Sequence, residues 1–539
     1  MKDQRLQIKD IIDHIDDATM GKLDIPEFQR GFVWKPDKAK MFVDSLWRDY
    51  PVGTILVWES KYNSPRISLG GDHNKLWIVD GQQRITTLSL LFGRKPYWWN
   101  DASEWNKKYQ EYDILVDISK PVDSLEFGLP NPVRKQAPEW ISVRKILSST
   151  DDDISNLAEE LEKKINQKLS VLFTKMQSIK KISEYPLYEV IIDHELEDVA
   201  EIFTRLNMAG VKVLESDVII ALIAAKQEGW VRNEFNEYLK SLKDEGFELE
   251  PAILIRTLAI IGKGMGRLKN IPNGFWDKDS VDFKAGWEKT KKSITFIVKK
   301  LREYGVLSSD ILPSHNTLIP LFVLHSKYGA SFNFKKAFYW FILATRDGRY
   351  SGSSTAILDQ DSKIINDNLD FNDVINALLE ELRISKDFTD NDFLNDYRDR
   401  FTRLMLYLIV FNHKAKDWLF QDIRIGYDRS DNVLNEGYKP EWHHFFPKKI
   451  LKNKNINDNV INCAANIVVL NEKSNKAFSS KTPYQYLEQF NVDTQRLTEQ
   501  MIPTNREIWE IDNYNKFLSK RASLLTNAAN TFLEMLRKG

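Results

Sequence analysis

Several features that mark secreted, membrane-spanning and zinc-binding proteins are missing from this sequence. Its 539 residues include one cysteine, Cys463, so the chain can form neither an intrachain disulfide nor a zinc site built from several cysteines. The N-terminal segment contains no apolar signal core, and the longest apolar runs, such as Val218–Ala225, are too short to span a bilayer. We therefore predict a cytoplasmic protein that does not interact with membranes.

An excess of one sign of charge is also absent. The 76 basic and 77 acidic side chains give a net charge of -1, so the overall charge does not indicate nucleic-acid binding. The local charge does, because the segment Lys439–Lys481 contains eight lysines and only three acidic residues. Contacts to phosphates depend on such local clusters, and this segment is therefore the candidate for DNA binding.

The sequence also lacks a Gly-x-x-x-x-Gly-Lys-Ser/Thr run, and this absence excludes an ordinary P-loop.

The 42% apolar and 28% charged residues are typical of a globular protein, and the length exceeds that of a single hydrophobic core. Apolar periodicity predicts an α+β, multi-domain chain. We expect an α+β domain at residues 1–215, a helical connecting region at 216–390 and a third domain at 391–539, with the polar stretch Ser385–Asn395 at the second boundary.

Short periodic runs predict the main elements. The expected helices are 8–19, Asp37–Tyr50, Ile85–Phe92, a helix or helix pair at Asp151–Lys181, and Tyr397–Asn412. The expected strands are Thr54–Trp58, Lys75–Val79, Leu187–Asp193 and Asn466–Leu470.

The segment around His443 and His444 is the most informative part of the chain. The two histidines are adjacent, Asn466 follows in a strand-like run, and Asn475 lies at the expected start of a helix. A neutral histidine can activate water near pH 7, and a divalent cation with few protein ligands can stabilise charge on a scissile phosphate. Two adjacent histidines alone would more often be core or surface residues. With the spaced asparagines, the pattern resembles the ββα-metal (His-Me finger, or HNH) nuclease motif.

The resemblance implies a role for each of these residues. His444 would be the general base, and Asn466 would orient its imidazole through its side chain or backbone. His443 and Asn475 would hold Mg²⁺ or Mn²⁺. The lysines that would contact DNA phosphates are Lys448, Lys449 and Lys476.

A second constellation, Asp80-Gly81-Gln82-Gln83-Arg84, follows a predicted strand and opens a predicted helix. Backbone N–H groups at a helix start attract phosphate, Gly81 permits close approach of the backbone, and Arg84 offers a bidentate fork. From these residues alone, an anion site and a capped helix with an ordinary ion pair are equally good interpretations.

Two further segments, Pro26–Trp34 and Glu201–Gly210, accompany this run in the same order. The trio resembles the DGQQR domain of GmrSD-type restriction proteins, which implies a ParB/sulfiredoxin-like fold over most of residues 10–220. The nuclease resemblance covers about 400–500, so the two together imply the fused, single-chain form of the family. The phosphorothioate-sensing SspE-type and BrxU-type proteins have a similar layout.

The resemblance also implies what each part does. The N-terminal domain would bind and hydrolyse a nucleoside triphosphate (GTP, ATP or CTP) through Asp80, Gly81, Gln82, Gln83 and Arg84, with Gln29, Arg30 and Asn207 nearby. The C-terminal domain would cut double-stranded DNA that carries modified bases or a modified backbone, as phage DNA often does. A homodimer would allow cleavage of both strands. Two alternatives stay open, namely a nucleotide-switched DNA-binding protein without nuclease activity and a nuclease that acts on RNA or host nucleic acid.

Overall fold

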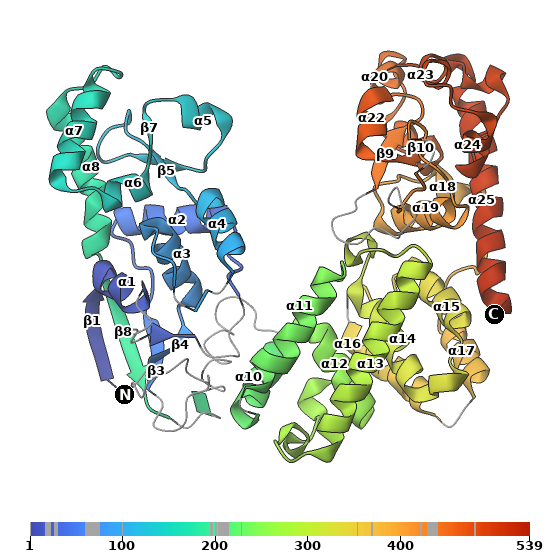
Figure 1. The fold of residues 1–539 in the computed structure, drawn as a ribbon, viewed down its shortest axis with the longest axis horizontal. Helices are drawn as coiled ribbons and strands as arrows, with labels where there is room; N and C mark the ends of the chain where they lie inside the picture. Colours follow the sequence, from blue (N-terminus) through green and yellow to red (C-terminus); the bar gives the residue numbers. More distant parts are fainter. Residues whose placement is uncertain are drawn as a thin grey trace. The chain divides into compact units, whose positions relative to one another are not determined.

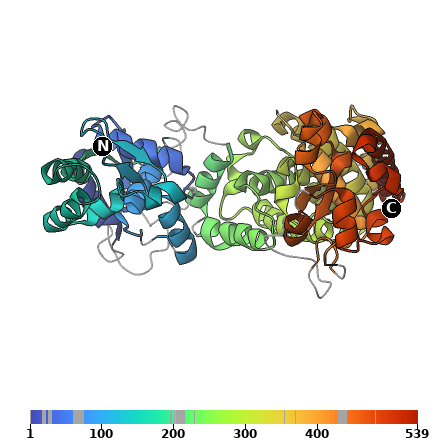
Figure 2. The same ribbon diagram turned by 90° about the horizontal axis from the view of Figure 1, so that it is seen from above.

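The chain folds into two compact units, Met1–Arg232 and Asn233–Gly539, in a computed structural model (Figures 1 and 2). The second unit contains all of the predicted 391–539 domain and most of the predicted helical region. The structure describes residues 2–16, 23–25, 31–59, 76–96, 98–99, 101–194, 198–199, 202, 215–227, 229–352, 354–367, 370–420, 423–427, 440–478 and 481–539.

The first unit is built on a mixed five-stranded sheet with the order β1-β8-β3-β4-β2. Its strands are β1 (Lys2–Gln7), β2 (Leu23–Asp24), β3 (Ile55–Glu59), β4 (Leu76–Asp80) and β8 (Pro186–Ile192). β1 and β8 pair antiparallel although they come from opposite ends of the unit, and β3 pairs parallel with β8. The expected strands at 54–58, 75–79 and 187–193 are confirmed, whereas β1 was not predicted because its sequence is almost entirely polar.

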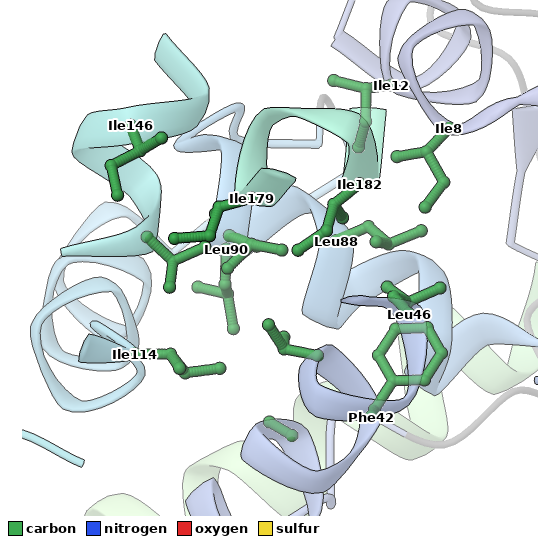
Figure 3. Packing of buried hydrophobic residues seen from close by; sticks show 14 of the residues in the cluster. Ile8, Ile12, Phe42, Leu46, Leu88, Leu90, Ile114, Ile146, Ile179 and Ile182 are labelled. Carbon is green, nitrogen blue, oxygen red and sulfur yellow. The ribbon is translucent and has the colours of Figure 1, made fainter. Parts of the chain in front are cut away.

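Helices α1 (Ile8–Asp16), α2 (Pro36–Trp47), α3 (Gln82–Phe92) and α8 (Leu169–Lys180) enclose the apolar core of this unit. Figure 3 shows Ile8, Leu46, Leu88 and Ile179 converging from these four helices. Most side chains of α3 are buried, so the helix that begins directly after Gly81 is a core element. Its position therefore depends on packing as well as on its first turn.

A three-stranded sheet, β6-β5-β7, and a helix pair lie between β4 and β8 in the sequence. The pair is α7 (Asp151–Glu162) and α8, which confirms the expected charged helices at 151–181. Thr150 and Asp153 form a capping box that starts α7. The remaining elements are α4 (Ala102–Glu111), β5 (Leu115–Asp117), β6 (Glu126–Gly128), α5 (Pro132–Gln136), β7 (Trp140–Ser142), α6 (Val143–Ser148) and α10 (Glu215–Lys226).

The second unit is mostly helical. Its first helices are α11 (Glu237–Asp244), α12 (Pro251–Lys263), α13 (Val281–Glu303), α14 (Leu318–Tyr328), α15 (Phe334–Arg346), α16 (Ser354–Asn366) and α17 (Phe371–Glu380). They are followed by α18 (Asp390–Leu394), α19 (Arg400–Asn412), β9 (Glu441–His444), α20 (Lys448–Asn453), α21 (Asp458–Ile461), β10 (Ile467–Leu470), α22 (Glu472–Phe478), α23 (Pro483–Gln489), α24 (Thr494–Glu499) and α25 (Tyr514–Lys538). The C-terminal helix α25 packs against α15, α18 and α19.

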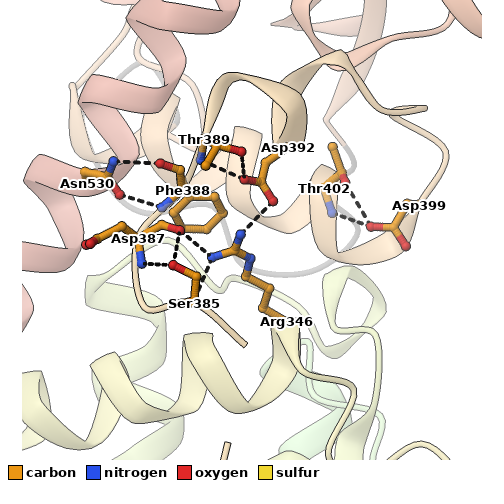
Figure 4. A network of polar contacts seen from close by, with 9 residues as sticks. All are labelled: Arg346, Ser385, Asp387, Phe388, Thr389, Asp392, Asp399, Thr402 and Asn530. Atoms are coloured by element: carbon orange, nitrogen blue, oxygen red, sulfur yellow. Dashed lines mark hydrogen bonds and ion pairs between the residues drawn. The ribbon is translucent and has the colours of Figure 1, made fainter. Parts of the chain in front are cut away.

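The polar stretch Ser385–Asn395 is held firmly between these helices (Figure 4). Arg346 on α15 donates to the carbonyls of Ser385 and Asp387, both at 3.1 Å, and pairs with Asp392 at 2.7 Å. Asn530 on α25 bonds both the N–H and the C=O of Phe388. Side chains from before and after the stretch thus anchor it, which is why the helical region and the C-terminal residues form one unit.

Within the described residues, no helix has both the length and the apolar character needed to cross a membrane.

Candidate active site

The His443–His444 pair lies on β9, which pairs antiparallel with β10, and α22 follows directly after β10. His443 is opposite Val468 and His444 is opposite Ile467. Successive side chains of a strand point to opposite faces. Glu441 and His443 therefore share one face, and Trp442 and His444 share the other.

On the first face, a hydrogen-bonded chain joins Glu441, Asn475 and His443. The amide nitrogen of Asn475 donates to Glu441 Oε2 at 3.1 Å, and Asn475 Oδ1 lies 2.9 Å from His443 Nδ1. A carboxylate can only accept, so the amide NH₂ must face Glu441 and the amide oxygen must face His443. His443 therefore donates through Nδ1–H, and its lone pair is on Nε2.

The second nitrogen of His443, Nε2, is buried and has no hydrogen-bond partner among the described residues. The rings of Phe478 and Tyr486 both lie 5.6 Å from the imidazole, centroid to centroid. Burial lowers the pKa of His443 to about 4, so the ring is neutral at physiological pH. A neutral, preoriented imidazole beside an amide oxygen has the donor atoms of a cation site.

On the other face, His444 Nε2 lies 3.1 Å from Asn462 Oδ1. The Asn462 amide nitrogen donates to the carbonyl of Asp458 at 2.8 Å, so its oxygen faces His444 and accepts from Nε2–H. This leaves Nδ1 of His444 as a proton acceptor. Burial lowers the pKa of His444, opposed by the Asn462 hydrogen bond and reinforced by Lys448, which favours the neutral ring.

Asn466 contacts the backbone that follows His444. Its side chain accepts from Phe446 N–H at 2.9 Å and donates to the carbonyls of Phe446 and Ile461, and its own carbonyl accepts from Phe445 N–H at 2.7 Å. Asn462, which is not part of the predicted histidine–asparagine series, is the asparagine that touches the imidazole. It follows His444 by 18 positions, a spacing that no helix or strand period could have flagged.

A buried aspartate, Asp417, fixes the start of α22 and was also missed. It accepts from the N–H groups of Leu419 (3.0 Å), Phe420 (2.9 Å) and Asn471 (2.8 Å) and from the hydroxyl of Ser474. Because Ser474 directly precedes Asn475, this carboxylate positions the helix that presents Asn475 to His443.

The predicted DNA-contacting lysines are exposed at the surface of the second unit. Lys448 and Lys449 open α20, and Lys476 on α22 pairs with Glu472 of the same helix. An exposed pair of this kind stabilises little and leaves the ammonium free to exchange partners.

In the first unit, Asp80 ends β4 and Arg84 lies in the first turn of α3. Arg84 donates to Asp80 Oδ2 at 2.7 Å and to the carbonyl of Val52 at 2.8 Å. Gly81, between strand and helix, has φ of 104°, a conformation that side chains rarely adopt. The ion pair that the sequence left open as an alternative is present, and the Asp80 side chain remains 42% exposed.

The two glutamines of this run differ in their surroundings. Gln83 binds the preceding loop, since Oε1 accepts from Val33 N–H at 2.8 Å and Nε2 donates to the carbonyl of Gly31 at 3.1 Å. Gln82 is buried, and its Oε1 has no hydrogen-bond partner among the described residues. Gln29, Arg30 and Asn207, which the resemblance places in the same pocket, lie outside the described residues.

Residues 8–224 match the family described as GmrSD restriction endonuclease, N-terminal domain. The first unit has a GmrSD-type domain. The match runs from α1 into α10 and confirms the resemblance for this part of the chain. GmrSD proteins are restriction endonucleases, and the family therefore indicates a nuclease with DNA as its substrate.

A similar protein occurs in Methanocaldococcus jannaschii under the name Uncharacterized protein MJ0686. It is 22% identical over 538 residues, which cover 89% of this chain and 86% of that protein. Since the first unit ends at Arg232, a match of this extent must include much of both units. Sequences similar to both units are thus joined in one chain there as well.

Proposed function

We propose that this protein, whose first unit matches the GmrSD N-terminal domain, is a metal-dependent, nucleotide-regulated HNH-type endonuclease that cuts modified foreign DNA in the cytoplasm, as a defence against phage. The observation that carries this proposal is the strand–strand–helix arrangement in which His443 meets Asn475 while His444 is held separately by Asn462. A GmrSD-type domain in the same chain makes DNA the expected substrate.

His443 and Asn475 are the residues that would hold Mg²⁺ or Mn²⁺. Asn475 Oδ1 lies 2.9 Å from His443 Nδ1, and Glu441 fixes the amide in that orientation. For both atoms to bind one cation, the proton on Nδ1 would have to move to Nε2. No group of three or more His, Cys, Asp or Glu side chains is arranged for a metal within the described part of the chain. A site with one imidazole and one amide would be completed by water and phosphate. When bound, the cation would stabilise charge on the scissile phosphate and on the leaving oxygen.

His444 would accept the proton of the attacking water. Its neutral ring, with Nε2–H donated to Asn462, leaves Nδ1 free to accept. Asn466 would hold the backbone that leads away from His444, and Lys448, Lys449 and Lys476 would contact the DNA backbone.

The first unit would bind and hydrolyse GTP, ATP or CTP and report DNA modification. The strand–Gly81–helix junction, the half-exposed Asp80 and the unpartnered oxygen of buried Gln82 support this assignment. Arg84, which contacts Asp80 and the carbonyl of Val52, would supply the positive charge that binds a phosphate. A homodimer would bring two nuclease sites to the two strands.

Cleavage by the purified full chain tests the proposal. The substrates are matched DNAs with unmodified, hydroxymethylcytosine-containing or phosphorothioate strands, and an RNA of the same sequence, each with Mg²⁺ and with or without nucleotide. We expect cleavage of a modified DNA, its loss in chelator and its recovery with Mn²⁺.

His444→Ala should lower the cleavage rate by about 10²–10⁴-fold, the usual effect of losing a general base. His194→Ala, which removes an exposed histidine of the first unit, is the matched control and should cut normally. Cleavage by His444→Ala at the parental rate would show that the base lies elsewhere.

A further inference from the structure

A cleft of about 490 Å³ adjoins β9 within the second unit. Its lining includes Arg400, Arg403 and Tyr407 from α19, Glu441 and Trp442 from β9, and Asp310. A volume of this size lies within the range of small-ligand sites, and the mixture of cations and aromatic rings is typical of nucleotide recognition.

Arg403 is the central cation of the cleft. Its guanidinium carbon lies 5.2 Å from the ring centroid of Tyr397 and 5.8 Å from that of Trp442. Its Nε is buried and has no hydrogen-bond partner among the described residues. A guanidinium that lies beside two aromatic rings and lines a cleft can bind an anion through its planar fork of donors.

Arg400 supplies a second cation one helical turn before Arg403, on the same side of α19. Its Nη1 donates to the carbonyl of Pro313 at 3.3 Å, which directs the guanidinium and leaves other donors available. Two neighbouring arginines can hold one phosphate between them.

The cleft is connected to the candidate base through aromatic contacts. The ring of Tyr397 lies 6.4 Å from that of Trp442 and 5.7 Å from the imidazole of His444. Trp442 and His444 also share a face of β9. Arg403 is thus separated from His444 by one aromatic ring, close to where a strand cut at His444 must pass.

We infer that the cleft binds one nucleotide unit of the DNA strand beside the scissile phosphate, with its phosphate on Arg400 and Arg403 and its base against Trp442 and Tyr407. This inference rests on the proposed function. A base that enters such a cleft must leave the stack, and aromatic side chains replace the contacts it loses. Asp310 also lines the cleft, and its carboxylate can only accept hydrogen bonds, so a base with an amino group suits the cleft.

Binding of a fluorescein-labelled single-stranded oligodeoxycytidine to the full chain tests the inference without requiring cleavage. Measurements in chelator, across a range of salt concentrations, give both affinity and the number of phosphate contacts. We expect Arg403→Ala to weaken binding at least about tenfold and to reduce the slope of log K against log salt by roughly 0.7–1. Arg400→Ala should act in the same direction.

Two further variants keep this result interpretable. Arg403→Lys retains the charge but loses the planar fork, so it should bind with intermediate affinity and a nearly unchanged salt slope. Arg398→Ala removes an exposed arginine that pairs with Asp396 outside the cleft, and it should bind as the parent does. Circular dichroism checks that each variant is folded.

Unchanged affinity and salt slope in both Arg400→Ala and Arg403→Ala would overturn the inference. Deoxycytidine monophosphate that binds as tightly as the oligonucleotide, with the same dependence on Arg403, would also overturn it, because the cleft would then serve a free nucleotide. Loss of cleavage in all assays, with the Arg403 effect on binding intact, would reject the nuclease proposal and leave the binding site standing.

Discussion

At the scale of single residues, two adjacent histidines have different chemistry because a strand turns them to opposite faces. His443 is almost fully buried and meets an amide whose orientation is set by Glu441. His444 meets the amide of Asn462, whose orientation is set by the Asp458 carbonyl. In each case a second group behind the asparagine determines which ring nitrogen is protonated. Such supporting groups commonly affect metal affinity or activity 10–100-fold.

Glu441→Gln tests this dependence directly. The new amide can donate as well as accept, so the Asn475 side chain is no longer forced to direct its oxygen toward His443. We expect binding of Mn²⁺, followed by electron paramagnetic resonance, to weaken about 10–100-fold.

Glu472→Gln, on the exposed face of α22, is the control for Glu441→Gln and should bind Mn²⁺ as the parent does. Equal Mn²⁺ affinity in Glu441→Gln and the parent would mean that Glu441 does not orient the ligand.

At the scale of elements, the site depends on how β10 and α22 are joined to α19 and its following loop. Asp417, which is fully buried, connects the loop after α19 to the first turn of α22. Gln500 adds a second connection, since its side chain accepts from the N–H of Val469 and donates to the carbonyl of the same residue. β9 and β10 form a two-stranded sheet, which is marginal alone and requires such supports.

Asp417→Ala should therefore lower the free energy of unfolding by about 3 kcal/mol or more, because several buried donors lose their acceptor at once. Urea denaturation of the full chain, followed through the unfolding transition of the second unit, measures this change in free energy. Asp493→Ala removes only the N-cap of α24 and should cost about 1 kcal/mol. Equal effects of the two substitutions would contradict the supporting role of Asp417.

The pairing of β8 with β1 leads to a separate prediction about how the stability of the first unit depends on pH. Glu189 on β8 is buried opposite Gln4 on β1 and accepts a hydrogen bond from it. Burial raises the pKa of Glu189, and the Gln4 hydrogen bond only partly opposes this. The folded state then holds the proton to higher pH than the unfolded state, whose glutamate pKa is about 4.3. The free energy of unfolding should therefore fall as pH rises from about 4.3 through the raised pKa.

Glu189→Gln should remove this fall in the free energy of unfolding. It should therefore stabilise the first unit at pH values above the raised pKa of Glu189. Urea midpoints measured between about pH 4 and pH 8 give the comparison. Glu126→Gln, at an exposed position on β6, should leave the profile unchanged. A parental profile that rises through this range would contradict the assignment.

At the scale of the whole molecule, one chain combines a GmrSD-type unit with a second unit that contains the candidate nuclease. An unregulated nuclease would damage host DNA, so we expect the first unit to control the second. A nucleotide can shift activity only if it binds two states of the protein differently. We expect it to change the cleavage rate at least about fivefold, the low end of a typical coupling free energy of 1–3 kcal/mol.

Truncation tests this control. From the sequence, a segment starting near residue 391 is expected to cut DNA with little regard for modification. The structure favours a start at Asn233, because α15 and Arg346 of the helical region anchor α18 and α25. We expect residues 233–539 to cut modified and unmodified DNA at similar rates, while the full chain discriminates. Equal discrimination by both would place the sensor in the second unit.

Much of the local structure was determined by the sequence alone. Apolar periodicity predicted α2, α3, the α7–α8 pair and α19, and short β-rich runs predicted β3, β4, β8 and β10, because these patterns extend over only a few residues. The α+β character of the chain followed from them. The histidine–asparagine series and the DGQQR run were likewise recognisable as local motifs.

Only the tertiary structure decided which side chains meet. The pairings of Asp417 with Asn471, of His444 with Asn462, and of Arg403 with Trp442 join segments far apart in the sequence, and no local period encodes them. β1 escaped prediction for the same reason, since its polar residues form a strand only because β8 offers a partner edge. Residue type and spacing determine what an element can be, whereas packing across long sequence separations determines which groups share a site.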